Sequence, residues 1–220
     1  MFMMERLSNN IANKISSELK LDNDRREVVE YGAFVLLQTL LSIILVVIFG
    51  WLFNVIIEAL LISFIMSILR KYSGGVHASA SDICAIIGTI VCVGLAILIS
   101  YINSLLNLNF VLILGVLIFI WSYYIVYKLV PVDSPTKPIK NEEKRKRMKK
   151  SSITILNMYL IIVVFIIVTY LNIGVEHLLN YSLCIYVGLA WQVFTLTSTG
   201  HFIMARIDTF FNKILISERR

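Results

Sequence analysis

Two side chains that work as a pair in many enzymes, His77 and Cys84, lie seven residues apart in a short polar segment. Long apolar stretches flank this segment on both sides. A cysteine thiolate is a strong nucleophile, and a neighbouring imidazole can hold the proton that the thiol loses. The residue types therefore predict a thiol nucleophile with its general base, placed where a polar loop meets apolar chain.

The start of the following helix is expected to favour the anionic form of Cys84. Ser81 or Asp82 is a natural N-cap, which would place Cys84 in the first helical turn. The positive end of the helix dipole stabilises an anion there, and free backbone N–H groups can serve as oxyanion donors. Asp82 would oppose the thiolate if its charge pointed toward the sulfur.

The spacing also sets a geometric condition on the pair. Seven residues return to the same face of a helix, but they lie about 10 Å apart along its axis. A hydrogen bond between His77 and Cys84 needs roughly 3 Å. The chain must therefore fold back, and Gly74 and Gly75 provide the permissive backbone where this can begin.

Simpler interpretations of these residues remain open at this point. A lone cysteine in a membrane helix is usually a packing residue, and a lone histidine at its boundary is usually a solvated one. A metal site built from His77, Asp82 and Cys84 is disfavoured, because structural zinc takes four ligands and no other His or Cys is near in sequence. We expect no metal and no cofactor.

The composition is that of a membrane protein. Apolar residues make up 58% of the 220 residues and charged residues only 15%. The apolar residues occur in runs of about 20, the length that crosses a hydrocarbon core of roughly 30 Å. We therefore expect one membrane domain over residues 1–220, in an all-α integral membrane protein.

About six transmembrane helices are expected from these runs. They cover residues 31–53, 55–69, 82–102, 110–130, 153–173 and 179–199. The second run is short and carries Glu58, so one or two spans are expected to be short or re-entrant.

Two further segments fall outside the apolar runs. Within residues 1–30, an apolar stripe at helical spacing predicts an amphipathic interfacial helix, which either packs on its own neighbouring loops or docks a partner. The stripe consists of Met4, Leu7, Ile11, Ile15 and Leu19. No signal-peptide core is present, so this segment is expected to stay on the protein. Residues 131–152 hold all three prolines and a dense basic run, and they predict a loop.

The positive charges are placed on one side of the membrane by this arrangement. With six spans, all 20 Lys and Arg residues fall on the side of the two termini, the 70–84 segment and the 131–152 loop. The positive-inside rule makes that side cytoplasmic. The net charge of +6 is thus explained by orientation, and no nucleic-acid partner is expected. Cys92 and Cys184 lie within apolar runs and are expected to be small buried residues.

The run from Arg70 through Ala78, followed by Cys84, resembles the signature of the accessory gene regulator protein B (AgrB) family. These proteins are bacterial cell-membrane cysteine endopeptidases of peptide quorum sensing. The resemblance covers essentially the whole chain, including residues 6–12 and the Pro-Lys-Pro loop that leads into the basic run.

The resemblance implies a substrate and a reaction. The substrate is an AgrD-like propeptide with an amphipathic leader, a central signal segment and an acidic tail. Cys84 would attack the bond before the tail, with His77 as base and then acid, and the acyl-enzyme would be captured to give a cyclic thiolactone or lactone. A homodimer is also implied. No third catalytic residue is assignable, although Glu58, Ser73 and Gln192 are weak candidates.

Residues that support substrate binding are expected around the reacting pair and in the basic run. They are Arg70, Lys71, Ser73, Gly74, Gly75, Lys137, Lys144, Arg145 and Arg147. Their positive charge would attract an acidic tail, but the same charges also suit orientation and anionic lipid. The alternative function is a small exporter or channel for a peptide without proteolytic activity. The spans carry few polar side chains to line a pathway, which disfavours this alternative.

Overall fold

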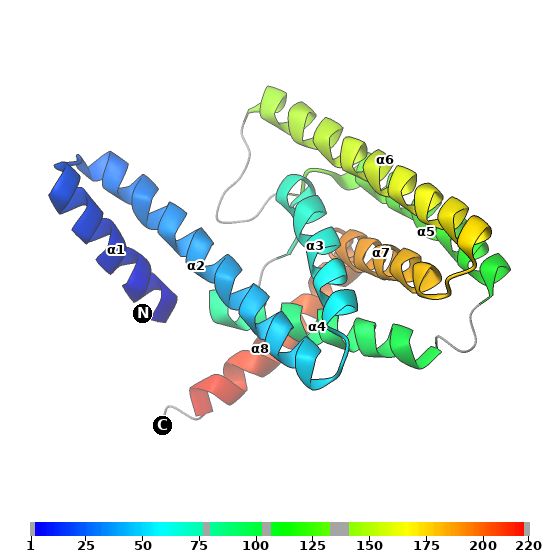
Figure 1. Ribbon diagram of the computed structural model, residues 1–220. Coiled ribbons are helices and arrows are strands. Elements are labelled where there is room, and N and C mark those ends of the chain that lie inside the picture. Colours follow the sequence, from blue (N-terminus) through cyan, green and yellow to red (C-terminus); the bar gives the residue numbers. More distant parts are fainter. Residues whose placement is uncertain (1–2, 77–79, 103–106, 133–140, 218–220) are drawn as a thin grey trace.

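The computed structural model describes residues 3–76, 80–102, 107–132 and 141–217, and these residues form eight helices and no named strand. The helices are α1 (Met3–Leu19), α2 (Asn23–Leu52), α3 (Ile56–Ser73), α4 (Ser81–Ile102), α5 (Leu108–Leu129), α6 (Glu142–Ile173), α7 (His177–Phe194) and α8 (Ser198–Ser217). Figure 1 shows α3 to α7 packed together, with α1 and α2 at one side of the molecule.

The helices confirm an all-α integral membrane protein. In the described residues, α2, α4, α5 and α6 are long and apolar enough to cross a membrane, and α7 with α8 qualifies as a fifth span broken by an 88° bend. The remaining core helix, α3, accounts for the difference from six spans. Both α3 and α7 have only 18 residues, and α3 carries Glu58, Arg70 and Lys71. Helix α3 corresponds to the second run, which the sequence predicted to be short.

Helix α7 is the centre of the bundle. Most of its residues are buried, and it packs against α3, α4, α5 and α6 (Figure 1). The close approach of α5 depends on Gly115, since a Cβ there would lie 2.3 Å from Oη of Tyr186. The Tyr186 ring meets Phe119 edge-on at 6.1 Å between centroids. Tyr159 of α6 donates a buried hydrogen bond of 2.9 Å to the carbonyl of Ile65 on α3.

Two helix boundaries differ from the prediction. The loop expected over 131–152 ends at Asn141, whose side chain accepts from Lys144 N at 3.1 Å and caps α6. Capping and good helix formers after the last proline extend α6 back through the basic run. The chain beyond residue 199 forms α8, which the charged tail had not indicated. Its half-apolar sequence packs on α4, and Met204 is buried there.

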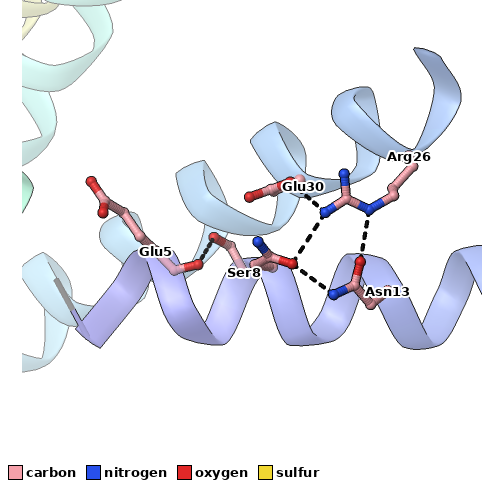
Figure 2. A network of polar contacts seen from close by, with 6 residues as sticks. Glu5, Ser8, Asn13, Arg26 and Glu30 are labelled. Carbon is pink, nitrogen blue, oxygen red and sulfur yellow. Dashed lines mark hydrogen bonds and ion pairs between the residues drawn. The ribbon is translucent and has the colours of Figure 1, made fainter. Parts of the chain in front are cut away.

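Helices α1 and α2 form a hairpin (Figure 2). The face of α1 that turns inward carries Met4, Ser8, Ala12 and Ser16, spaced four residues apart. The predicted stripe of Leu7, Ile11, Ile15 and Leu19 is instead exposed. Small residues pack closely on α2, and α1 retains an apolar surface of the kind that an interfacial helix requires.

Candidate functional site

The C-terminal end of α3 is held against the end of α5. Gly74 caps α3 with φ of 74° and ψ of −149°, and its N–H donates to the carbonyl of Arg70 at 3.0 Å. Val132 N–H donates to the carbonyl of Ser73 at 3.0 Å, which makes a one-residue parallel bridge between Gly74 and Val132. A Cβ on Gly74 would lie 2.2 Å from the Val132 carbonyl oxygen. Only glycine fits this position.

The same turn is held by α7 from another side. Gln192 is fully buried, and its Nε2 donates to Gly74 O at 2.9 Å and to Ser73 Oγ at 3.2 Å. Gly75, with φ of 131°, lies so close to α7 that a Cβ would be 3.1 Å from Thr195 Oγ1. Gln192 Oε1 is buried without a hydrogen-bond partner among the described residues. This polar contact joins two of the weak candidates, Ser73 and Gln192, at the base of the turn.

Cys84 lies in the first turn of α4, as expected. The helix begins at Ser81, and Cys84 N–H donates to the carbonyl of Ala80 at 3.0 Å. Both Ser81 and Asp82 lie inside the helix rather than at its cap, so Ala80 supplies the first accepting carbonyl. The N–H of Cys84 itself is therefore occupied, and an oxyanion donor must come from an earlier amide of the helix. The Cys84 side chain is half-buried, and its thiol is free.

Arg70 interacts with residues on both sides of His77 in the sequence, Val76 and Cys84. Its Nη2 donates to the carbonyl of Val76, the residue before His77. Burial lowers the pKa of Arg70, and its electrostatic interaction with Cys84 acts in the opposite direction. Arg70 thus fixes the backbone before His77 and contributes positive charge at the nucleophile.

His77 and Lys137 lie outside the described residues. The residues on either side of His77 are consistent with the predicted fold-back, because α3 ends at Ser73, residues 74–76 are not helical and α4 begins at Ser81. The two helices that carry the flanking chain are therefore separate. Among the described residues, no group of three or more His, Cys, Asp and Glu side chains could hold a metal ion.

The basic residues of α6 lie at the same end of the bundle as the catalytic segment (residues 70–84). Tyr123 of α5 donates to Asn157 of α6 at 2.5 Å, and Lys149 Nζ lies 4.2 Å from the Tyr127 ring centroid, so the basic part of α6 lies beside the C-terminal half of α5. Lys144 and Arg147 are exposed, whereas Arg145 is half-buried. Lys71 is exposed on α3, where its Nζ lies 5.5 Å from the Tyr72 ring centroid.

The structure separates the other candidates from this site. Glu58 lies in the first turn of α3, about 18 Å along the helix from Arg70. Cys92 and Cys184 are buried, as predicted, and Cys92 Sγ is 3.9 Å from Met66 Sδ.

Sequence reasoning missed the residues that press on the turn from outside the motif. Val132 and Thr195 contact Gly74 and Gly75, and Met204 of α8 joins Ala80 and Ile83 in a buried cluster. None has a side chain that indicates chemistry. Only the glycine pair indicated that neighbouring backbone must approach closely.

These features define a multi-pass helical membrane protein with a half-buried cysteine at the start of one helix and a half-buried arginine near the end of the helix before it. The family model described as Accessory gene regulator B matches residues 8–196. Two proteins of Clostridium perfringens, from strain SM101 / Type A and strain 13 / Type A, are named as AgrB-like. Each is 46% identical over 215 residues, which is 97% of this chain and 100% of the relative. No solved structure matches. The chain belongs to the accessory gene regulator B family, which links it to peptide processing in quorum sensing.

Proposed function

We propose that this protein is a membrane cysteine endopeptidase that removes the acidic tail of a quorum-sensing propeptide and promotes cyclisation of the remainder. The observation that carries the proposal is the position of Cys84 in the first turn of α4, near the Arg70 guanidinium. The positive end of the α4 dipole and the earlier free amides of its first turn lie beside this nucleophile, where they can stabilise an oxyanion. Family membership supports a propeptide as the substrate.

The proposed reaction begins when His77 takes the proton from the Cys84 thiol. The thiolate attacks the carbonyl carbon of the bond before the tail, and a new S–C bond forms as that C–N bond breaks. His77 returns its proton to the leaving amine. A nucleophilic side chain of the bound peptide then attacks the thioester, releases the Cys84 thiolate and closes a thiolactone or lactone ring.

The surroundings of Cys84 support transfer to the peptide rather than to water. On one side, α8 packs on α4 through a buried cluster of Ala80, Ile83, Ile87 and Met204. The turn at Gly74 and Gly75 is held by contacts to α5 and α7. A shielded thioester loses less intermediate to hydrolysis.

The charge distribution supports delivery of the tail to the same end of the bundle. Lys71 of α3 and Lys144 and Arg147 of α6 are exposed, and together with Lys137, which precedes α6 in the sequence, they would attract acidic residues. We propose that these residues and the catalytic segment face the cytoplasm, as all 20 Lys and Arg residues lie on one side of a six-span topology. Homodimer formation stays a prediction.

The test uses membranes that contain the full chain and a synthetic propeptide with an amphipathic leader, a cysteine-containing central segment and an acidic tail. We expect Cys84→Ala and His77→Ala each to abolish tail release, because one removes the nucleophile and the other removes its base. Cys92→Ala is the matched control and should retain cleavage. Mass spectrometry of wild-type protein should detect an acyl adduct on Cys84. Undiminished cleavage by Cys84→Ala would refute the peptidase.

A further inference from the structure

A groove of 380 Å³ opens between α4, α5 and α7, and its lining is apolar. The lining residues are Leu95 of α4, Trp121 of α5, and Val187, Ala190, Trp191 and Phe194 of α7. The rings of Trp191 and Phe194 are 5.7 Å apart between centroids and form one wall. No charged side chain lines this groove, so it can bind apolar groups and not the acidic tail.

The groove is lined by Leu95, which lies on the same face of α4 as Cys84. Cys84, Gly88, Val91 and Leu95 follow one another at spacings of four, three and four residues, so they share one helix face. All four are only partly buried. A Cβ built on Gly88 would meet nothing within 4 Å, so space remains beside the helix between the cysteine and the groove. Cys84 and Leu95 are about 16 Å apart along the axis.

Trp191 provides a second connection between the groove and the catalytic segment. Its side chain lines the groove and also packs against the cluster of Ala80, Ile83, Ile87 and Met204. Val76, which precedes His77, packs against the same cluster. A ligand in the groove therefore contacts a side chain that supports both ends of the chain around His77.

We propose that this face of α4 and the groove bind apolar side chains of the peptide substrate, those that precede the cleaved bond. The inference rests on the proposed function, since it takes Cys84 as the acylated residue. An extended peptide of about five residues spans the 16 Å from Cys84 to Leu95. The two parts of the substrate then bind at different surfaces. The apolar segment lies in the groove, and the acidic tail lies toward Lys71, Lys144 and Arg147.

Affinity labels that react with Cys84 test the groove without requiring peptidase activity. The probes are three maleimides, one carrying a Leu-Phe-Leu-Phe amide, one a Ser-Gly-Ser-Gly amide, and one a dodecyl chain that imitates a lipid. The full chain is reconstituted in lipid nanodiscs, and peptide mapping by mass spectrometry gives the labelling rate at Cys84. The measured quantity is the ratio of the apolar-peptide rate to the polar-peptide rate.

Ala190→Trp fills the groove, and Val116→Trp is the matched control because Val116 lies on the exposed surface of α5. We expect Ala190→Trp to lower the ratio about tenfold. This is the change in binding expected when the apolar peptide loses the burial of roughly two methylene groups. Val116→Trp should leave the ratio unchanged. An equal ratio in both variants would overturn the proposal. An effect of Ala190→Trp on the dodecyl label alone would also overturn it, because the groove would then hold lipid.

Gly88→Leu gives an independent result if Ala190→Trp does not fold. A leucine there extends into the open space between Cys84 and the groove, so the ratio of the apolar-peptide rate to the polar-peptide rate should fall. An unchanged ratio in a folded Gly88→Leu protein would reject the groove. Failure of the proposed function would give a different result. The wild-type protein would then not cleave the propeptide, although Cys84 would still react faster with the apolar peptide label than with the polar one.

Discussion

At the residue scale, the glycine pair is explained by what lies on either side of it. Gly74 is pressed against the Val132 carbonyl and Gly75 against Thr195 Oγ1, and both have positive φ. Two segments distant in sequence, the ends of α5 and α7, therefore meet on the two residues that precede Val76 and His77. The pair is a close-packed junction as well as a place where the chain can bend.

Substitution of Gly74 should show this junction directly. We expect Gly74→Ala to lower the free energy of unfolding by about 1–3 kcal/mol, because a strained φ is added to a clash with the Val132 carbonyl. Gly94→Ala is the matched control, since a Cβ there meets nothing within 4 Å. Thermal melting in detergent measures both. Equal melting temperatures for the two variants would mean that the junction is not rigid.

Arg70 offers a test of the electrostatics at Cys84. In Arg70→Gln the thiolate loses its positive neighbour, so the rate of Cys84 alkylation by N-ethylmaleimide at neutral pH should fall. Lys71→Gln is the control, because Lys71 is exposed and its Nζ lies over the Tyr72 ring. Equal alkylation rates for wild type and Arg70→Gln would contradict the role of Arg70.

At the element scale, the hairpin of α1 and α2 depends on one polar network (Figure 2). Arg26 Nε donates to Asn13 Oδ1 at 2.7 Å, and its Nη2 donates to Asn9 Oδ1 at 3.1 Å and lies 3.3 Å from Glu30 Oε2. Asn13 Nδ2 donates in turn to Asn9 Oδ1 at 2.7 Å. One arginine thus satisfies two side chains of α1 from a position on α2.

Removal of this arginine should loosen α1 and leave the bundle intact. In Arg26→Ala we expect the amides of α1 to exchange with solvent several-fold faster, while the amides of α7 keep their protection. Arg25→Ala is the matched control. The Arg25 side chain is exposed, and its Nε lies 3.9 Å from Asp22 Oδ2, outside α1. Hydrogen exchange followed by mass spectrometry distinguishes the two. Unchanged exchange in Arg26→Ala would show that packing alone holds α1.

The sequence predicts the helices better than it predicts their contacts. Apolar runs and the polar break at 70–84 were sufficient to place α2 to α7, since both signals are local. The apolar stripe of α1 was found correctly, but its packed face was not, because Ser8, Ala12 and Ser16 fit closely for reasons of size rather than hydrophobicity. Contacts of Gln192 with Ser73 and Gly74 join residues far apart in sequence, and no local pattern predicts such a pairing.

At the scale of the whole molecule, the ends of α3, α5 and α7 meet at one end of the bundle. Ser73, Val132 and Gln192 are linked there by hydrogen bonds, and the basic start of α6 lies beside them. The count of positive charges in the sequence predicted that the catalytic segment and the basic run share a side. The bend between α7 and α8 could not be predicted in this way, because each of the two helices is ordinary in composition.

Reporter fusions test the proposed orientation. Alkaline phosphatase fused after Gly174, between α6 and α7, should be exported and active, whereas the same enzyme fused after Asn141 should stay inside and be inactive. The expectation follows from the absence of Lys and Arg in the segment between Ile173 and His177. Equal activity of the two fusions would contradict a six-span arrangement with this orientation.

The position of α8 has a consequence for the order in which the protein is made. Helix α8 is the last to leave the ribosome, yet Met204 completes the buried cluster that covers Ala80 and Ile83, on either side of the start of α4. The helix that carries Cys84 can be inserted early, but its outer face stays uncovered until the chain is finished. The buried cluster beside the start of α4 therefore forms only after α8 has been made, and a chain that lacks α8 holds Ala80 and Ile83 without this cover.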